Sequence, residues 1–261
     1  MGSAQVQGEL WDAAAANWAE LQEPTGSPLW RVMLDAAGVS DGTWLLDAGC
    51  GAGGASVIAA ERGAQVSGID ASPALIEIAR GRLPNGDFRV GDLEALPFED
   101  ATFDVVIAAN SVQYATDRVR AVQELQRVCS PGGHVVLGTW STPDKCEMRV
   151  IFGAGVGALP APPPGDGPFG LSSPGALELL LEQAGLRVAT TGEVDAPFDY
   201  VDMATFWRAQ SAAGPLQGAM RQVGEARVRD AVTSAAQSFA QDDGTLSIKN
   251  SFRFVMATRQ S

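Results

Sequence analysis

The sequence predicts an α/β protein with a doubly wound, Rossmann-like sheet of seven strands. Short apolar strands alternate with helices from residue 43 to residue 140, and such alternation is typical of a parallel sheet covered by helices on both faces. A glycine-rich turn follows the first strand, where nucleotide-like ligands bind in such folds. The length of 261 residues and the 46% share of hydrophobic residues suit a single domain, 1–261, with insertions.

Two helices are expected before the first strand, within residues 1–40. An aromatic segment with helical spacing, 11–21, is followed by an expected break at 24–26. Ser27 and Pro28 then offer an N-cap and a first-turn proline for a helix through residue 37. Dinucleotide-binding domains more often begin with their strand, so these helices argue mildly against that class.

The first strand, 43–46, leads through Asp47 into a glycine turn and a helix over 55–62. The turn matches G-x-G-x-x-G at Gly49, Gly51 and Gly54, a pattern that lets the backbone approach a nucleotide closely. A dinucleotide would bring its pyrophosphate to this helix N-terminus, where the carboxylate of Asp47 is unfavourable. A phosphate-free ligand with a cationic end would favour it, which points toward S-adenosylmethionine.

The cofactor-binding core, 41–140, continues with regular alternation. The expected elements are strand 65–69, helix 73–82, strand 87–90, loop 93–100, strand 103–108, helix 117–128 and strand 134–140. Ser72 and Pro73 supply a cap and a first-turn proline for the helix that starts there.

Two insertions interrupt the second half of the chain. Residues 141–172, which include the proline-rich run 160–165, are expected to be irregular. Helix 173–184 and strand 187–194 follow. Residues 195–243 are expected to form aromatic-rich helices before a long last strand over 245–258.

Charge and cysteine content exclude several classes. The net charge of −13 disfavours nucleic acid and anionic membranes, because both reward a basic surface. No apolar run is long enough to span a bilayer, and no leader pattern begins the chain, so a soluble, cytoplasmic protein is expected. Cys50, Cys129 and Cys146 are too scattered for disulfides or zinc, and no metal is expected.

Polar residues terminate each of the first four strands. Asp47, Asp70, Asp92 and Asn110 stand at these ends, and the carboxyl ends of parallel strands share one rim of the sheet. Ser111, Gln113 and Tyr114 follow onto the same rim, and Thr139 and Trp140 end the fifth strand there. The single histidine, His134, begins that strand and is expected at the opposite end, which argues against a role as general base.

Together these segments resemble the class I S-adenosylmethionine-dependent methyltransferases, in the small-molecule branch that includes quinone-biosynthesis enzymes. The matching runs are 47–51, 68–72, 91–98, 103–106 and 125–133. The resemblance implies that Asp70 holds ribose hydroxyls, that Asp92 meets the adenine amino group and that the last strand runs antiparallel. The implied cofactor residues are Trp18, Asp47, Ala48, Gly49, Gly51, Asp70, Ala71, Gly91, Asp92, Leu93 and Asn110.

The expected activity is methyl transfer to a small, apolar or aromatic molecule of natural-product type. Tyr114 and Gln113 are the candidate catalytic residues, and the two insertions are expected to form a lid. The expected pocket residues are Trp140, Met203, Phe206 and Trp207. The expected partners are the methyl acceptor and at most a second copy of the chain, as a monomer or homodimer. The alternatives are a nicotinamide-dependent oxidoreductase and a non-catalytic S-adenosylmethionine-binding protein.

Overall fold

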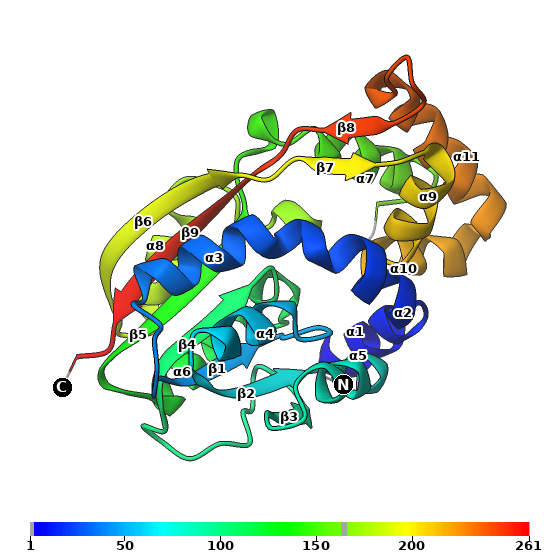
Figure 1. The fold of residues 1–261 in the computed structure, drawn as a ribbon. Helices are drawn as coiled ribbons and strands as arrows, with labels where there is room; N and C mark the ends of the chain where they lie inside the picture. Colours follow the sequence, from blue (N-terminus) through cyan, green and yellow to red (C-terminus); the bar gives the residue numbers. More distant parts are fainter. Residues whose placement is uncertain (1–2, 163–165, 261) are drawn as a thin grey trace.

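The computed structural model describes residues 3–162 and 166–260, and it confirms the doubly wound α/β fold (Figure 1). The sheet has seven strands in the order β3-β2-β1-β4-β5-β9-β6. Five strands lie where the sequence predicts them: β1 (Trp44–Ala48), β2 (Gln65–Asp70), β3 (Asp87–Val90), β4 (Phe103–Ala109) and β6 (Arg187–Asp195). The strand β5 (Cys129–Trp140) begins five residues before the expected 134–140 and includes the expected turn at 131–133. The seventh, β9 (Ser251–Thr258), pairs antiparallel with both β5 and β6, so the antiparallel last strand is confirmed.

Helices cover both faces of the sheet because successive side chains of a strand point to opposite faces. Leu45 packs on one face with α3 (Ser27–Ala36) and α4 (Gly54–Glu61), whereas Leu46 packs on the other with α6 (Arg118–Val128) and α8 (Ala176–Gln183). The helix α5 (Pro73–Arg82) packs against β2 and β3. The helices α4, α5, α6 and α8 therefore each bury one side against the sheet and help to fix the strand ends.

The N-terminal segment is helical almost throughout. It contains α1 (Ser3–Asp12), α2 (Ala15–Asn17), a π-helical turn over Trp18–Gln22 and a 3-10 turn over Glu23–Gly26 that runs directly into α3. The expected break at 24–26 is therefore absent: the chain stays helical there, in the 3-10 conformation. Ser27 lies inside α3 and does not cap it; its Oγ accepts a hydrogen bond from Arg31 instead.

The first insertion is not irregular, as the sequence led us to expect. It contains α7 (Met148–Gly157), which packs against α10 (Gly214–Val223) and α11 (Glu225–Ala236). Glycine-rich helices are intrinsically weak, but Gly155 lets Leu216 approach closely: a Cβ there would lie 2.5 Å from its Cδ2. The packing of α7 against its neighbours thus outweighs its weak intrinsic helix propensity. Residues 163–165 of the expected proline-rich break lie outside the described part of the chain.

The last strand is divided in two. Residues Leu246–Ile248 form β8, which pairs with β7 (Phe198–Tyr200) in a short second sheet, and β9 begins at Ser251. Asn250 leaves the ladder between them and accepts a hydrogen bond from the backbone N–H of Met148 at 3.0 Å. Figure 1 shows β7 and β8 continuing the β6–β9 ribbon away from the sheet toward the helical layer.

That helical layer is built from both insertions and the N-terminus. It consists of α7, α9 (Met203–Ser211), α10 and α11, and α1 contacts α10. The expectation of helices in the second insertion is confirmed, although β7 precedes them. Within the described ranges 3–162 and 166–260, no helix is both long and apolar enough to cross a bilayer.

Candidate functional site

The glycine turn after β1 requires glycine at its first position. Gly49 has φ +82°, in the left-handed region that favours glycine. Its N–H donates to the carbonyl of Ile69 at 2.7 Å, and a Cβ on it would lie 2.2 Å from the Cβ of Ser111. The turn is therefore held tightly against the ends of β2 and β4, and no larger residue fits there.

Asp70, at the end of β2, holds the second half of this turn. Its Oδ2 accepts a hydrogen bond from the backbone N–H of Gly51 and its Oδ1 from that of Ser72, both at 2.9 Å. Desolvation raises the pKa of this carboxyl. Each carboxylate oxygen keeps a second acceptor site, so Asp70 can shape the turn and also accept hydrogen bonds from a diol.

Glu23, from the N-terminal segment, occupies the start of α4. Its Oε1 accepts a hydrogen bond from the backbone N–H of Ala52 at 2.7 Å. Arg82 forms an ion pair with the same carboxylate and donates to the carbonyls of Ala52 and Ala19. A helix N-terminus is the usual position for a ligand phosphate, and here a protein carboxylate already fills it.

Asp47 is buried below the turn. It is 2% exposed, and its Oδ2 accepts a hydrogen bond from Ser56 Oγ at 2.7 Å. Desolvation, with smaller contributions from the charges of Glu23 and Asp70, raises its pKa to about 7. The charges of Glu23 and Asp70 disfavour ionisation of Asp47, so a cation bound beside Asp47 would favour its charged form.

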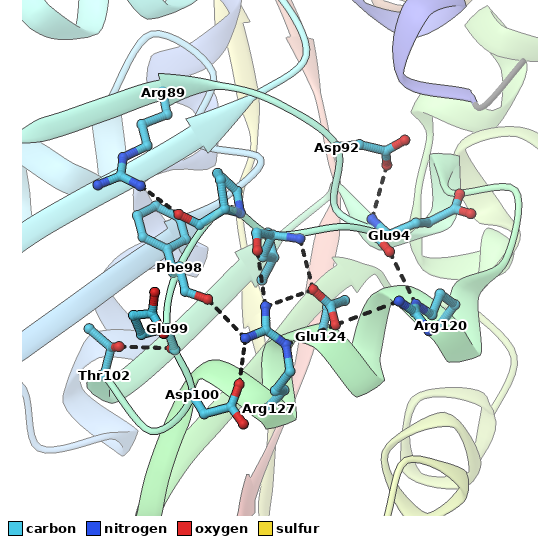
Figure 2. A network of polar contacts seen from close by, with 12 residues as sticks. Arg89, Asp92, Glu94, Phe98, Glu99, Asp100, Thr102, Arg120, Glu124 and Arg127 are labelled. Carbon is cyan, nitrogen blue, oxygen red and sulfur yellow. Dashed lines mark hydrogen bonds and ion pairs between the residues drawn. The ribbon is translucent and has the colours of Figure 1, made fainter.

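Asp92 lies on the loop after β3, which a network on α6 holds in place (Figure 2). Glu124 accepts a hydrogen bond from the backbone N–H of Leu96 at 2.8 Å, and Arg127 donates to the carbonyl of Leu96 at 3.0 Å. Hydrogen bonding to Arg127 lowers the pKa of Glu124. Asp92 Oδ1 accepts from the N–H of Glu94 at 2.9 Å, whereas its Oδ2 accepts no hydrogen bond from the described residues.

Asn110 ends β4 in an unusual backbone conformation. Its φ of +52° lies in the left-handed region, which non-glycine residues adopt rarely and often at functional sites. Its Oδ1 is buried and lacks a hydrogen-bond partner among the described residues. An acceptor held in this way fits a ligand that carries N–H donors.

These groups surround one cavity of about 190 Å³ at the carboxyl ends of the strands. Most of the residues expected to bind the cofactor border it: Trp18, Asp47, Gly49, Gly51, Asp70, Ala71, Gly91, Asp92, Leu93 and Asn110. Ala48 is fully buried in the core beneath the turn and does not border the cavity.

The candidate catalytic and pocket residues divide between cavity and core. Tyr114 borders the cavity and packs edge-on against Trp11, with ring centroids 5.9 Å apart. Gln113 is buried off the cavity wall, and its Nε2 has no partner among the described residues. The structure therefore leaves Tyr114 as the candidate that can reach a bound molecule.

Of the expected pocket residues, Trp140 alone borders the cavity. It contacts the rings of Phe152, Phe198 and Phe252 at centroid distances of 5.6, 5.7 and 4.7 Å, and all three rings line the cavity. The other three expected pocket residues do not border it. Phe206 and Trp207 lie on α9 within the hydrophobic core of the helical layer, and the half-buried Met203 packs against that core, because an amphipathic helix buries its apolar side against its neighbours.

His134 lies where the strand order predicts, at the amino-terminal end of the parallel segment of β5. It pairs with Val105 near the start of β4, and its Nδ1 lies 3.3 Å from the hydroxyl of Thr258. It is far along the strand from the rim. Within residues 3–162 and 166–260, no three His, Cys, Asp or Glu side chains gather in a way that could hold a metal ion.

Sequence reasoning missed Glu23, Asp12 and Trp30. Asp12 accepts hydrogen bonds from Ser72 and from the N–H of Ala74, which ties α1 to the start of α5. Trp30 packs against Gly54, where a Cβ would lie 2.6 Å from its ring, and it borders the cavity. No local sequence pattern marks these three residues as part of the site. The sequence offered one indication for Asp12 and Glu23: they are carboxylates in a largely apolar N-terminal segment.

Comparison with known proteins finds relatives of the core. A methyltransferase-domain family matches residues 46–137. The malonyl-[acyl-carrier protein] O-methyltransferase of Serratia marcescens is 37% identical over 138 residues, covering 53% of this chain and 51% of that protein. The demethylmenaquinone methyltransferase of Renibacterium salmoninarum is 33% identical over 122 residues, covering 47% and 52%.

A structural comparison supports the same fold. The YcgJ protein of Bacillus subtilis superposes with a TM-score of 0.62 at 18% identity, covering 89% of this chain and 98% of that one. The chain spans only about half the length of the relatives that it matches in sequence. The family match includes the end of β1, the glycine turn and the rim residues Asp70, Asp92 and Asn110. Residues 46–137 of this chain are therefore similar to a methyltransferase domain.

Proposed function

We propose that this protein transfers a methyl group from S-adenosylmethionine to a small, mainly apolar or aromatic molecule. The proposal rests mainly on one observation: the carboxylate of Glu23 lies at the N-terminus of α4. Glu23 accepts a hydrogen bond from the backbone N–H of Ala52 just before this helix, where a pyrophosphate would otherwise bind. With Asp47 and Asp70 beside it, the turn repels phosphates and suits a ligand with a cationic end. This arrangement disfavours a nicotinamide cofactor.

The residues of the rim suit the parts of S-adenosylmethionine. Asp70 would accept hydrogen bonds from the ribose diol, and Asp92 Oδ2, which has no partner among the described residues, would accept one from the adenine amino group. Asp47 would balance the positive charge of the bound cofactor. When bound, the cofactor supplies an electrophilic methyl group on a positively charged sulfur.

The cavity walls support positioning rather than base catalysis. Burial raises the pKa of Tyr114, so its phenol stays protonated at neutral pH and donates a hydrogen bond instead of removing a proton. Trp140 and its neighbouring phenylalanines give the same cavity an apolar wall. We infer that the acceptor is a nucleophile in its own right, such as an electron-rich ring carbon, that these side chains hold in line.

We also propose that the two insertions act as a lid on the single domain. The first insertion contributes Phe152 to the cavity wall, and the second contributes Phe198, Gln210 and Pro215. The helix α1 contacts both α5 and α10, so it joins the cofactor rim to this helical layer. A lid of this kind would close over the cofactor and the acceptor together.

A binding measurement tests the cofactor assignment. The demethylated product, S-adenosylhomocysteine, is expected to bind with a dissociation constant of micromolar order, and NADH is expected not to bind, because Glu23 fills the phosphate position. Isothermal calorimetry with both ligands measures this. Tight NADH binding with no response to S-adenosylhomocysteine would overturn the proposed function.

Replacing Asp70 by alanine is expected to weaken S-adenosylhomocysteine binding by about 1.5–3 kcal/mol, the range for hydrogen bonds to a charged group. The variant loses contacts to the ligand and also the two that hold Gly51 and Ser72. Asp92→Ala should act similarly through adenine. Calorimetry on each variant measures the effect, with Asp87→Ala, at the opposite end of β3, as the matched control. Normal binding by both variants would show that the strand ends do not form the cofactor site.

A further inference from the structure

Three neutral polar side chains meet inside the helical layer. Gln22, Tyr200 and Gln210 come from the π-helical turn, β7 and α9, and they are 7%, 4% and 1% exposed. Tyr200 Oη donates to Gln22 Oε1 at 2.8 Å. Gln210 Nε2 donates to Gln22 Oε1 at 2.9 Å and to Tyr200 Oη at 2.8 Å. The three therefore form a closed hydrogen-bonded triangle, which we call the amide triangle.

The amide triangle has hydrogen-bonding capacity left over. Gln210 Oε1 accepts no hydrogen bond from the described residues, and Gln22 Nε2 reaches only Thr25 Oγ1 at 3.5 Å, a weak contact. Exchanging oxygen and nitrogen in both amides preserves the triangle and again leaves one donor and one acceptor. Buried amides are normally satisfied by the protein, because an unpaired polar group is costly. The spare donor and acceptor are thus available to a ligand.

Both amides border the cavity, so a bound molecule can be their partner. Gln22 and Gln210 line it together with Trp140, Phe198 and Phe252. The charged side chains along its described wall are all carboxylates, Glu23, Asp47, Asp70 and Asp92, and they lie at the cofactor rim. No Lys, Arg or His stands among the described lining residues, so an anionic acceptor would find no counter-charge.

We propose that the amide triangle is the specificity-determining group of the methyl-acceptor cavity, and that it selects an uncharged aromatic molecule carrying a hydroxyl. A hydroxyl both donates and accepts, which matches the spare acceptor and donor. The aromatic walls take the ring, and the absence of a cation from the described wall excludes carboxylates and phosphates. This inference rests on the proposed function, because it places the acceptor beside the cofactor.

Three naphthalene probes test the proposal by binding alone. The protein is saturated with S-adenosylhomocysteine, and quenching of tryptophan fluorescence gives the dissociation constants of 2-naphthol, naphthalene and 2-naphthoate. The parent is expected to bind 2-naphthol about 3- to 10-fold more tightly than naphthalene, the ratio for one net neutral hydrogen bond. No binding of 2-naphthoate is expected. Equal affinity for the first two probes, or tight binding of 2-naphthoate, would overturn the proposal.

The variant Gln210→Met removes the amide while nearly preserving its volume. It is expected to lose the preference for 2-naphthol and to keep its affinity for naphthalene. Gln217→Met, on α10 and off the cavity wall, is the matched control and should keep the parent's preference. Gln22→Met gives a second test should Gln210→Met fail to fold. A preference that survives in the folded variant contradicts the proposal.

The same experiment separates this inference from the proposed function. Binding of S-adenosylhomocysteine is measured first for every variant. A protein that binds it but does not discriminate between the naphthalene probes refutes the amide triangle and leaves the cofactor assignment intact. A parent that does not bind it refutes the proposed function itself.

Discussion

Replacing Asp47 by asparagine is expected to stabilise the ligand-free protein by up to about 4 kcal/mol at pH 8. The folded pKa of about 7 lies above the ordinary value of 3.8, and a difference of about three pKa units corresponds to about 4 kcal/mol. The folded state holds its proton more tightly than the unfolded state. The penalty from Asp47 is therefore absent below about pH 4, grows as the pH rises and is complete above about pH 7.

Asparagine is neutral at every pH and can still accept the hydrogen bond from Ser56. Urea unfolding of the parent and of Asp47→Asn at pH 5 and pH 8 measures the effect, and the gap between them should widen with pH. The control is Asp35→Asn on the exposed side of α3, where a change of at most about 0.5 kcal/mol is expected. Parallel pH dependence in the parent and Asp47→Asn would mean that burial does not keep Asp47 protonated.

The same substitution should weaken cofactor binding while it stabilises the empty protein. A cation beside Asp47 favours the ionised carboxylate, so binding near pH 7 should release a proton from the parent. Calorimetry in two buffers of different ionisation enthalpy detects that release. The release should be absent from Asp47→Asn, which separates the charge of Asp47 from the other contacts of the rim.

Replacing Phe206 by alanine is expected to lower the free energy of unfolding by about 3–5 kcal/mol, the range for a large aromatic side chain removed from a core. The ring is fully buried and packs edge-on against Tyr200, with centroids 5.3 Å apart. Its loss leaves a cavity between α9 and β7 that the surrounding helices can fill only in part. Urea unfolding followed by circular dichroism measures the change.

Met203→Ala is the matched control on the same helix, and a smaller loss is expected because Met203 is only half-buried. Cofactor affinity of the folded fraction of Phe206→Ala should stay near that of the parent. Unchanged stability together with altered binding of an acceptor would place Phe206 in the pocket, as the sequence suggested, and would contradict its position in the core.

Strand ends could be predicted from the sequence because two short-range rules determine them. An apolar run followed by a polar residue marks the end of a buried strand, and parallel strands share the rim at which they end. Asp47, Asp70, Asp92 and Asn110 were found in this way, and all four border the cavity. His134 could be placed at the far end by the same argument.

Long-range packing decided the rest. The sequence marks Phe206, Trp207 and Trp140 equally as large and apolar, but only the arrangement of α9 against its neighbours places the first two in the core and leaves Trp140 on the cavity wall. The helix α7 forms against its weak intrinsic propensity because α10 and α11 bury it.

The sequence by itself determined the doubly wound sheet, the glycine turn and the acidic rim, because each depends on local periodicity or on the order of strands. Tertiary structure alone brought Glu23 to the start of α4 and Gln22 to Gln210, 188 positions away. Such contacts depend on how the N-terminal helices and the insertions fold back over the rim. No local pattern encodes that path, since it is set by the total burial of apolar surface between elements distant in the chain.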